Sequence, residues 1–196
     1  MHFDGLCRHI GNVDPGPLAK AISELTDDDW DEWDHRQETF GPHRHTQTIP
    51  LLYDNDMRHT DPTPWPRLAK LQSALDPVLD AIRKEHAPAG AADDNGYFIR
   101  IILTRLSPGT TINRHRDEGE SLMRSHRYHV AINTNPLVDF FVGGTPNHFA
   151  AGEIWEINNR AYHAVRNASN QGRVHLILDY VVPGERVDDP EGVVFA

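Results

Sequence analysis

Residues 97–106, YFIRIILTRL, begin a series of short β-rich runs that decides the fold of this chain. Further runs follow at 126–133, 138–142, 153–157 and 173–182, separated by turn-rich segments such as Ser107-Pro108-Gly109 and Gly143-Gly144. Many short strands at this spacing are typical of an antiparallel sandwich or barrel. The sequence therefore predicts a mainly β protein with a jelly-roll core in its C-terminal part.

The N-terminal half has a different pattern. Residues 15–30 and 65–87 place apolar side chains at helical spacing, which predicts two helical regions. We expect Asp76-Pro77 to break or kink the second region, because proline lacks the N–H that an inner helical turn needs. Residues 45–53 predict a strand, in which Pro50 indicates a sheet edge or a strand end.

The length of the chain bounds its organisation. At 196 residues it is long enough for one domain with a substantial core. We therefore expect a single domain over 1–196. In that domain the helices and strands of 1–95 pack against the jelly-roll core of 96–183 and form the substrate side.

The amino-acid composition limits the classes of binding partner and the cellular compartment that we expect for this protein. The formal charge is −10, with 29 acidic against 19 basic side chains, which disfavours nucleic acid and anionic membranes as partners. The N-terminal residues lack the basic start and apolar core of a secretory signal, and no apolar run approaches about 20 residues. Cys7 is the single cysteine, which excludes an internal disulfide and thiolate zinc sites. We expect a cytoplasmic protein without nucleic-acid or membrane partners, and the oligomeric state stays open.

A possible metal site lies in the β-rich part. His115 and Asp117 occur in INRHRDEG, and His163 occurs in NNRAYHAVRN. Two imidazoles and one carboxylate on one side of a metal leave positions free for a chelating co-substrate and O2, which suits Fe(II) better than a closed structural zinc site. On an extended strand end, residues i and i+2 point to the same side, so His115 and Asp117 can reach one ion. Among 13 histidines a His-x-Asp pair arises easily by chance, so the interpretation depends on the whole ordered set.

Arg173 begins RVHLILDYVV, a strand apolar enough to be largely buried. A buried guanidinium is costly unless it is paired, and no acidic residue follows until Asp179, so an anionic ligand is an attractive partner. The alternative is a structural ion pair with a carboxylate distant in sequence. Arg127 and His129 share a strand face in RSHRYHVAI, which implies either an anion between them or a partner elsewhere in the chain.

Two further groups of residues are weaker candidates for the functional site. His175 shares a strand face with Arg173, and it either contacts substrate or is a core histidine with satisfied hydrogen bonds. His43, Arg44 and His45 form a local polar cluster, which we interpret as a rim of the substrate pocket rather than a second metal site.

The stretch from Thr104 to Asp179 resembles the aspartyl/asparaginyl β-hydroxylase family of Fe(II)/2-oxoglutarate dioxygenases. The segments that carry the resemblance are LTRLSPGTTINRHRD, RYHVAINTNP, GEIWEINNRAYHAVRN and RVHLILD. It implies a double-stranded β-helix, a cupin-like jelly roll, with His115, Asp117 and His163 as the catalytic iron ligands. It also implies that Arg173 binds the far carboxylate of 2-oxoglutarate. Further co-substrate contacts would fall on Arg127, His129 and Thr104.

The resemblance also implies a reaction. Because the chain keeps Asp117, where animal protein hydroxylases of the family have glycine, it is similar to the bacterial branch. It would hydroxylate a C–H bond of an amino acid, either free, in a peptide or carrier-bound, and consume O2 while 2-oxoglutarate becomes succinate and CO2. The alternatives are a cupin-type metal enzyme that does not use 2-oxoglutarate and a non-catalytic binding or sensory module. Arg173 argues against the cupin alternative, because such an enzyme needs no carboxylate clamp after its last ligand.

Overall fold

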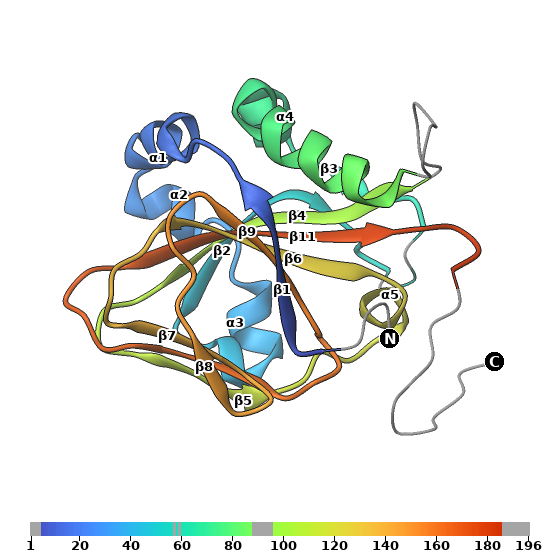
Figure 1. Ribbon diagram of the computed structural model, residues 1–196. Coiled ribbons are helices and arrows are strands. Elements are labelled where there is room, and N and C mark those ends of the chain that lie inside the picture. Colours follow the sequence, from blue (N-terminus) through green and yellow to red (C-terminus); the bar gives the residue numbers. More distant parts are fainter. Residues whose placement is uncertain (1–4, 57, 59, 88–95, 186–196) are drawn as a thin grey trace.

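The structure is a computed structural model that describes residues 5–56, 58, 60–87 and 96–185. Two antiparallel sheets lie one over the other, and helices cover the outer face of the larger sheet (Figure 1). The larger sheet has seven strands in the order β1-β9-β6-β11-β4-β2-β3, and the smaller has four in the order β5-β10-β7-β8. The predicted mainly β jelly-roll class is confirmed.

Among the described residues, six of the eleven strands coincide with the predicted β-rich runs, and β1, β3, β5, β8 and β10 lie outside those runs. The larger sheet contains β1 (Cys7–Asn12), β2 (Thr46–Tyr53), β3 (Thr63–Pro64), β4 (Tyr97–Leu106), β6 (His126–Asn133), β9 (Glu153–Ile157) and β11 (Arg173–Val181). The smaller contains β5 (Thr111–His115), β7 (Val138–Val142), β8 (Thr145–Asn147) and β10 (His163–Asn167). The helices are α1 (Gly16–Ser23), α2 (Asp27–Asp31), α3 (His35–Thr39), η1 (Gly41–His43), α4 (Pro66–His86) and α5 (Glu120–Met123).

Strand β11 runs through the middle of the larger sheet, and all nine of its residues are buried. Leu176 and Leu178 belong to the core that α1 and α4 cover. The alternate positions, from Arg173 to Asp179, face the smaller sheet, because successive strand side chains point to opposite faces. Polar side chains therefore enter the space between the sheets from an otherwise apolar strand.

The helix α4 contains the proline at which the sequence predicted a break or a kink. It is continuous from Pro66 to His86 with Pro77 inside it, so Pro77 does not break the helix. An internal proline costs about 3 kcal/mol. On the inner side of α4 four apolar residues are buried: Leu75, Val78, Leu79 and Ile82. Full burial of such a side chain contributes about 1.5–3 kcal/mol, so packing against the sheet outweighs the cost of the proline.

The N-terminal half contributes strands as well as helices to the core. Strands β1 and β2 belong to the seven-stranded sheet. Pro50 lies in β2 beside a register shift, and β3 pairs only with the end of β2, so Pro50 is at a sheet edge as predicted. Among the described residues, no helix is long and apolar enough to cross a membrane.

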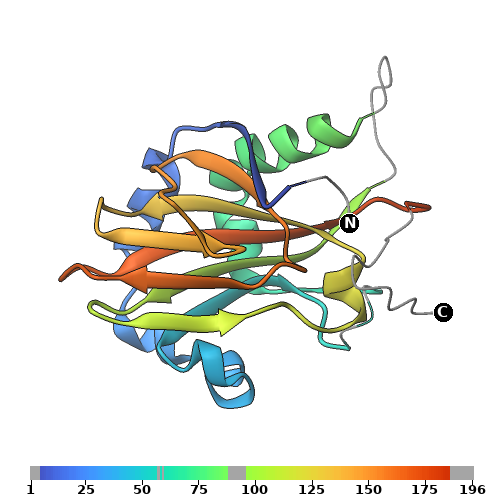
Figure 2. The same cartoon turned by 60° about the horizontal axis from the view of Figure 1, so that its bottom comes forward.

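Figure 2 shows the smaller sheet from its outer side, with α3 and η1 beside β5. Strands β7 and β8 form a hairpin through Gly143 and Gly144, whose φ angles are 58° and 85°. Positive φ at both central positions is the requirement of the tight hairpin turn that this Gly-Gly pair indicated. The smaller sheet covers the inner face of the larger one and encloses the polar side chains of β11.

Candidate metal centre

The three candidate ligands come from two adjacent strands of the smaller sheet and the segment that follows one of them. His115 ends β5 and His163 begins β10, and the antiparallel register places them directly opposite each other. Asp117 lies two residues beyond the end of β5, so strand alternation does not position it. Its backbone N–H donates to the carbonyl oxygen of Asn159, 3.1 Å away, which fixes the segment beside β10.

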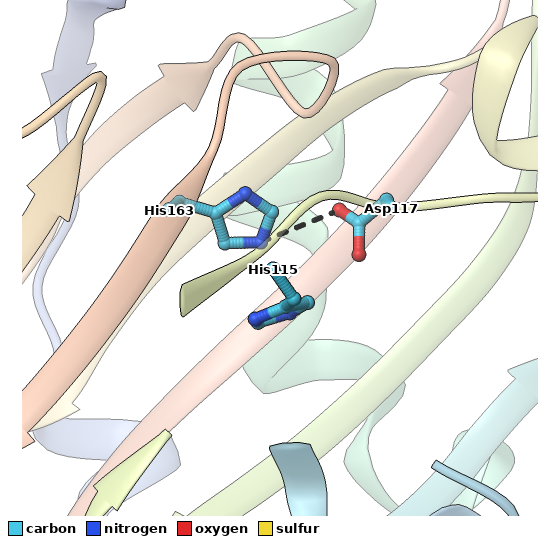
Figure 3. Close-up of side chains that lie close together, drawn as sticks. All are labelled: His115, Asp117 and His163. Carbon is cyan, nitrogen blue, oxygen red and sulfur yellow. Dashed lines mark ion pairs between the residues drawn. The ribbon is translucent and has the colours of Figure 1, made fainter. Parts of the chain in front are cut away.

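These three side chains converge (Figure 3). One ligand atom from each of His115, Asp117 and His163 lies within 4.8 Å of the other two. His163 Nε2 is 3.7 Å from Asp117 Oδ2, and the two imidazole centroids are 4.3 Å apart. Two imidazoles and one carboxylate at this spacing could hold one ion and leave a side of it open.

Hydrogen bonds set the tautomers of both imidazoles. His115 Nδ1 donates to the carbonyl oxygen of Asn113 at 2.7 Å, and His163 Nδ1 donates to that of Ala161 at 3.1 Å. A carbonyl oxygen only accepts, so each Nδ1 carries the proton and each Nε2 keeps its lone pair for a metal. Burial and the neighbouring His163 lower the pKa of His115, which favours the neutral form that binds metals.

Asp117 is held by an arginine. Arg127 Nη1 donates to Asp117 Oδ2 at 2.6 Å, while Arg127 Nε and Nη2 donate to the two carboxylate oxygens of Asp179 at 2.7 and 2.8 Å. Burial raises the pKa of Asp117, but Arg127 and the histidines around the carboxylate together outweigh burial and leave that pKa well below its usual value. The partner of Arg127 is therefore a pair of carboxylates from elsewhere in the chain. Asp179 forms an ion pair with Arg127 rather than with Arg173.

Arg173 is the opposite case. It is 1% exposed, and among the described residues no carboxylate lies within ion-pair distance of its guanidinium. Arg173 Nη2 donates to His175 Nδ1 at 2.5 Å, and Arg173 Nε has no partner. Burial lowers the pKa of Arg173 to about 9. A buried guanidinium in this state is stabilised by an anion, so the observation fits a dicarboxylate co-substrate.

An inner cavity behind the metal ligands collects the other predicted co-substrate contacts. Its walls include Thr104, His129, Phe140 and Arg173. Both ring nitrogens of His129 are buried without a partner, and Thr104 Oγ1 donates to the carbonyl oxygen of His175 at 3.3 Å. His129 and Arg173 can donate to an acceptor-rich ligand, whereas the single O–H of Thr104 is used by the carbonyl oxygen of His175. The cavity is narrow, about 20 Å³, so binding a dicarboxylate requires the lining side chains to move apart.

A larger outer cavity of about 420 Å³ opens on the other side of His115 and Asp117. The sequence did not point to several of its wall residues, among them Arg36, Tyr53 and Tyr162. Tyr162 directly precedes the candidate ligand His163, so its position in the sequence could have indicated that it lies near the site. The other two belong to segments without a motif.

The polar cluster at 43–45 divides between two places. His43 is in the wall of both the inner and the outer cavity. Arg44 and His45 line a separate surface hollow. Only His43, among the three, borders the candidate metal centre.

Residues 85–183 match the family described as Aspartyl/Asparaginyl beta-hydroxylase. No sequence among curated proteins matches the chain.

Three solved structures share the fold. An oxidoreductase of the 2OG-Fe(II) oxygenase family from Burkholderia pseudomallei is 16% identical and covers 69% of this chain and 67% of its own, with a TM-score of 0.54. The viral collagen prolyl hydroxylase from Paramecium Bursaria Chlorella virus-1 is 11% identical, with coverages of 91% and 97% and a TM-score of 0.53. HygX from Streptomyces hygroscopicus, with nickel and 2-oxoglutarate bound, is 14% identical, with coverages of 92% and 84% and a TM-score of 0.54.

At these identities the structural likeness establishes the fold alone, whereas the family match spans just over half of the residues. The chain belongs to the aspartyl/asparaginyl β-hydroxylase family and is an Fe(II)- and 2-oxoglutarate-dependent hydroxylase.

Proposed function

We propose that the enzyme hydroxylates an amino acid, either free, within a peptide or bound to a carrier. The observation that carries this proposal is the convergence of His115, Asp117 and His163 beside an open cavity of about 420 Å³, whose wall includes His115 and Asp117. Cavities of roughly 300–1,000 Å³ are typical of sites for small molecules. The size suits an amino acid or a short peptide segment as substrate.

In this proposal His115, Asp117 and His163 bind Fe(II) through Nε2, a carboxylate oxygen and Nε2. Arg173 binds the far carboxylate of 2-oxoglutarate, and Arg127, His129 and Thr104 border the same co-substrate. The hydrogen bonds from Nδ1 of both imidazoles, the ionised carboxylate and the buried guanidinium without a carboxylate partner among the described residues support these roles.

When bound, Fe(II) with 2-oxoglutarate and O2 supplies the oxidising power for C–H hydroxylation, and 2-oxoglutarate leaves as succinate and CO2. Arg127 keeps Asp117 ionised and fixes its orientation, as an outer partner does for a metal ligand. The carbonyl oxygens of Asn113 and Ala161 hold the two imidazoles with Nε2 turned to the metal. Burial of the inner cavity keeps water away from the co-substrate side.

The first 95 residues form the substrate side in this proposal. Residues of α3, η1 and β2 supply much of the wall of the outer cavity, including Thr39, His43 and Tyr53. The part that matches the family supplies the base, with His115 and Asp117. Substrate choice would then depend on the N-terminal half, and the metal chemistry on the C-terminal half.

The test is an NMR screen with Fe(II), 2-oxoglutarate and a panel of free amino acids, peptides and carrier-bound amino acids. The expected result is succinate in equal amount with one hydroxylated panel member. The variant Asp117→Ala should give neither product, because it removes an iron ligand. Turnover of a substrate of another chemical class, with every amino acid and peptide left unchanged, would contradict the proposal.

A further inference from the structure

Arg36 is a buried arginine that the proposed iron and co-substrate sites do not use. It lies in α3, outside the segment that matches the family, and is 6% exposed. It lines the outer cavity and also the inner one, so it lies where the two meet beside the metal centre. Arg36 Nη2 donates to His43 Nε2 at 3.2 Å, and Arg36 Nη1 is buried without a partner.

The charges around the centre leave Arg36 without a counter-ion. The described part of the chain buries four arginines and three aspartates. Two of these arginines are paired within the protein: Arg100 with Asp54, and Arg127 with Asp117 and Asp179. Glu156, another buried acid, is bound to Arg8 and His126. Fe(II) and the 2-oxoglutarate dianion cancel each other in charge, so one excess positive charge remains, and Arg36 carries it.

His43 adds a second donor at the same place. Because His43 Nε2 accepts from Arg36, its proton is on Nδ1, and Nδ1 is buried without a partner. Arg36 Nη1 and His43 Nδ1 are thus two neighbouring donors that lack an acceptor.

A carboxylate has the chemistry that both donors require. It offers only acceptors, it carries the single negative charge that balances Arg36, and it matches the planar fork of a guanidinium. The His43 ring lies 4.9 Å from the His115 ring, so a group bound here is about one imidazole away from a candidate iron ligand. A molecule held by this end would have its neighbouring atoms beside the metal centre.

We propose that Arg36 and His43 form a carboxylate-binding subsite for the substrate, and that the enzyme acts on a molecule with a free carboxylate. This deepens the proposed function and rests on it for the reacting end of the substrate. Among amino-acid substrates it selects those with an ionised carboxylate. It disfavours a carrier-bound amino acid, whose α-carboxylate is consumed in the thioester, unless the side chain supplies the anion.

The first test needs neither turnover nor a known substrate. The wild-type protein, loaded with Zn(II) in place of Fe(II) and with saturating 2-oxoglutarate, is titrated with acetate and separately with acetamide. The Nε–H signal of Arg36 is followed by NMR and is identified by its loss in Arg36→Lys. Acetate should shift this signal saturably, and acetamide should not. The signal of Arg100, whose guanidinium is held by Asp54, is the control and should stay in place. No acetate-dependent shift at Arg36, or equal shifts from both probes, overturns the proposal.

The second test uses the substrate that the NMR screen identifies. Converting its carboxylate to an amide should raise KM about 10- to 100-fold in the wild type, the loss of one charge-assisted contact. Arg36→Gln should raise KM by a similar factor for the acid but leave KM for the amide nearly unchanged. The KM for 2-oxoglutarate should stay within threefold, and so should the Zn(II) affinity. The exposed neighbour Arg44 provides the matched control, Arg44→Gln, which should behave as wild type.

Other outcomes separate the possible roles. If Arg36→Gln weakens 2-oxoglutarate instead, Arg36 belongs to the co-substrate site. If it weakens Zn(II), Arg36 acts as a positioning residue through His43, and in either case the subsite proposal is wrong. Acetate binding at Arg36 without turnover of any amino acid or peptide would refute the proposed function and leave the subsite standing. If an amino acid is turned over and its KM does not change when its carboxylate is converted to an amide, the subsite proposal is refuted but the proposed function is not.

Discussion

Replacing Arg173 with methionine is expected to stabilise the protein in the absence of co-substrate while weakening its response to 2-oxoglutarate. These two effects have opposite signs because Arg173 is buried at 1% exposure, with no carboxylate partner among the described residues. Its charge destabilises the empty protein and becomes useful when an anion binds. A structural arginine would behave in the reverse way, since its loss would lower the stability.

The magnitudes follow from the same observations. Burial lowers the pKa of Arg173 from 12.5 to about 9, and at 1.36 kcal/mol per pH unit this corresponds to roughly 5 kcal/mol against the charged form. Losing the hydrogen bond to His175 offsets about 1 kcal/mol of that. Replacing buried charged groups by apolar side chains typically raises the free energy of unfolding by about 1–4 kcal/mol, so the Tm should rise by several degrees. Losing the charge-assisted contact should raise KM for 2-oxoglutarate about 10- to 150-fold.

The assay combines thermal unfolding and kinetics. At 100 times the wild-type Kd, 2-oxoglutarate should stabilise the metal-loaded wild type by about 2.7 kcal/mol, and at the same concentration it should stabilise Arg173→Met by only about 0.3–1.4 kcal/mol. Metal affinity should be unchanged. The control is Arg166→Met, which alters an exposed arginine paired with Asp139. A variant that unfolds at lower temperature than the wild type while its KM is unchanged would assign Arg173 to the fold and refute this reasoning.

Three further predictions follow. Asp117→Ala should weaken Zn(II) binding by at least 100-fold by calorimetry, because it removes a ligand, whereas Asp139→Ala should not change it. Arg127→Leu should lower the free energy of unfolding by about 3–5 kcal/mol in urea titrations, because two buried carboxylates lose their cation; a loss below 1 kcal/mol would contradict this. Burial, followed by Arg173, holds the pKa of His175 well below its usual value, so below about pH 6.5 the unfolded chain binds a proton that the folded protein does not. Stability should therefore fall as pH falls, by up to about 1.4 kcal/mol per pH unit from this residue, and His175→Gln should make the slope shallower in urea titrations between pH 5 and 7.5.

The strands were predictable because their signal is local. The run at 97–106 coincides with β4, and the run at 173–182 exceeds β11 by one residue. Alternation also indicated correctly that Arg127 and His129 share a face. The continuous α4 was not predictable, because the burial that outweighs the cost of Pro77 comes from a sheet assembled from distant segments.

The types of residue at the site were predictable, but their pairing was not. His115, Asp117 and His163 were identified by chemistry and order, and the structure brings them together. The reason given for Asp117 was incomplete, since a backbone hydrogen bond to Asn159 positions it after β5 has ended.

The amino-acid sequence by itself determined the strands of the β-rich runs and which side chains have the chemistry to bind a metal and a dicarboxylate. Both depend on residue type and on spacing within one strand. Only the tertiary structure decided that Asp179 pairs with Arg127, that Arg173 is left without a carboxylate, and that Arg36 reaches the metal centre from the N-terminal half. Ion pairing and burial depend on distances between segments that are far apart in the chain, and those distances exist only once the sheets have packed.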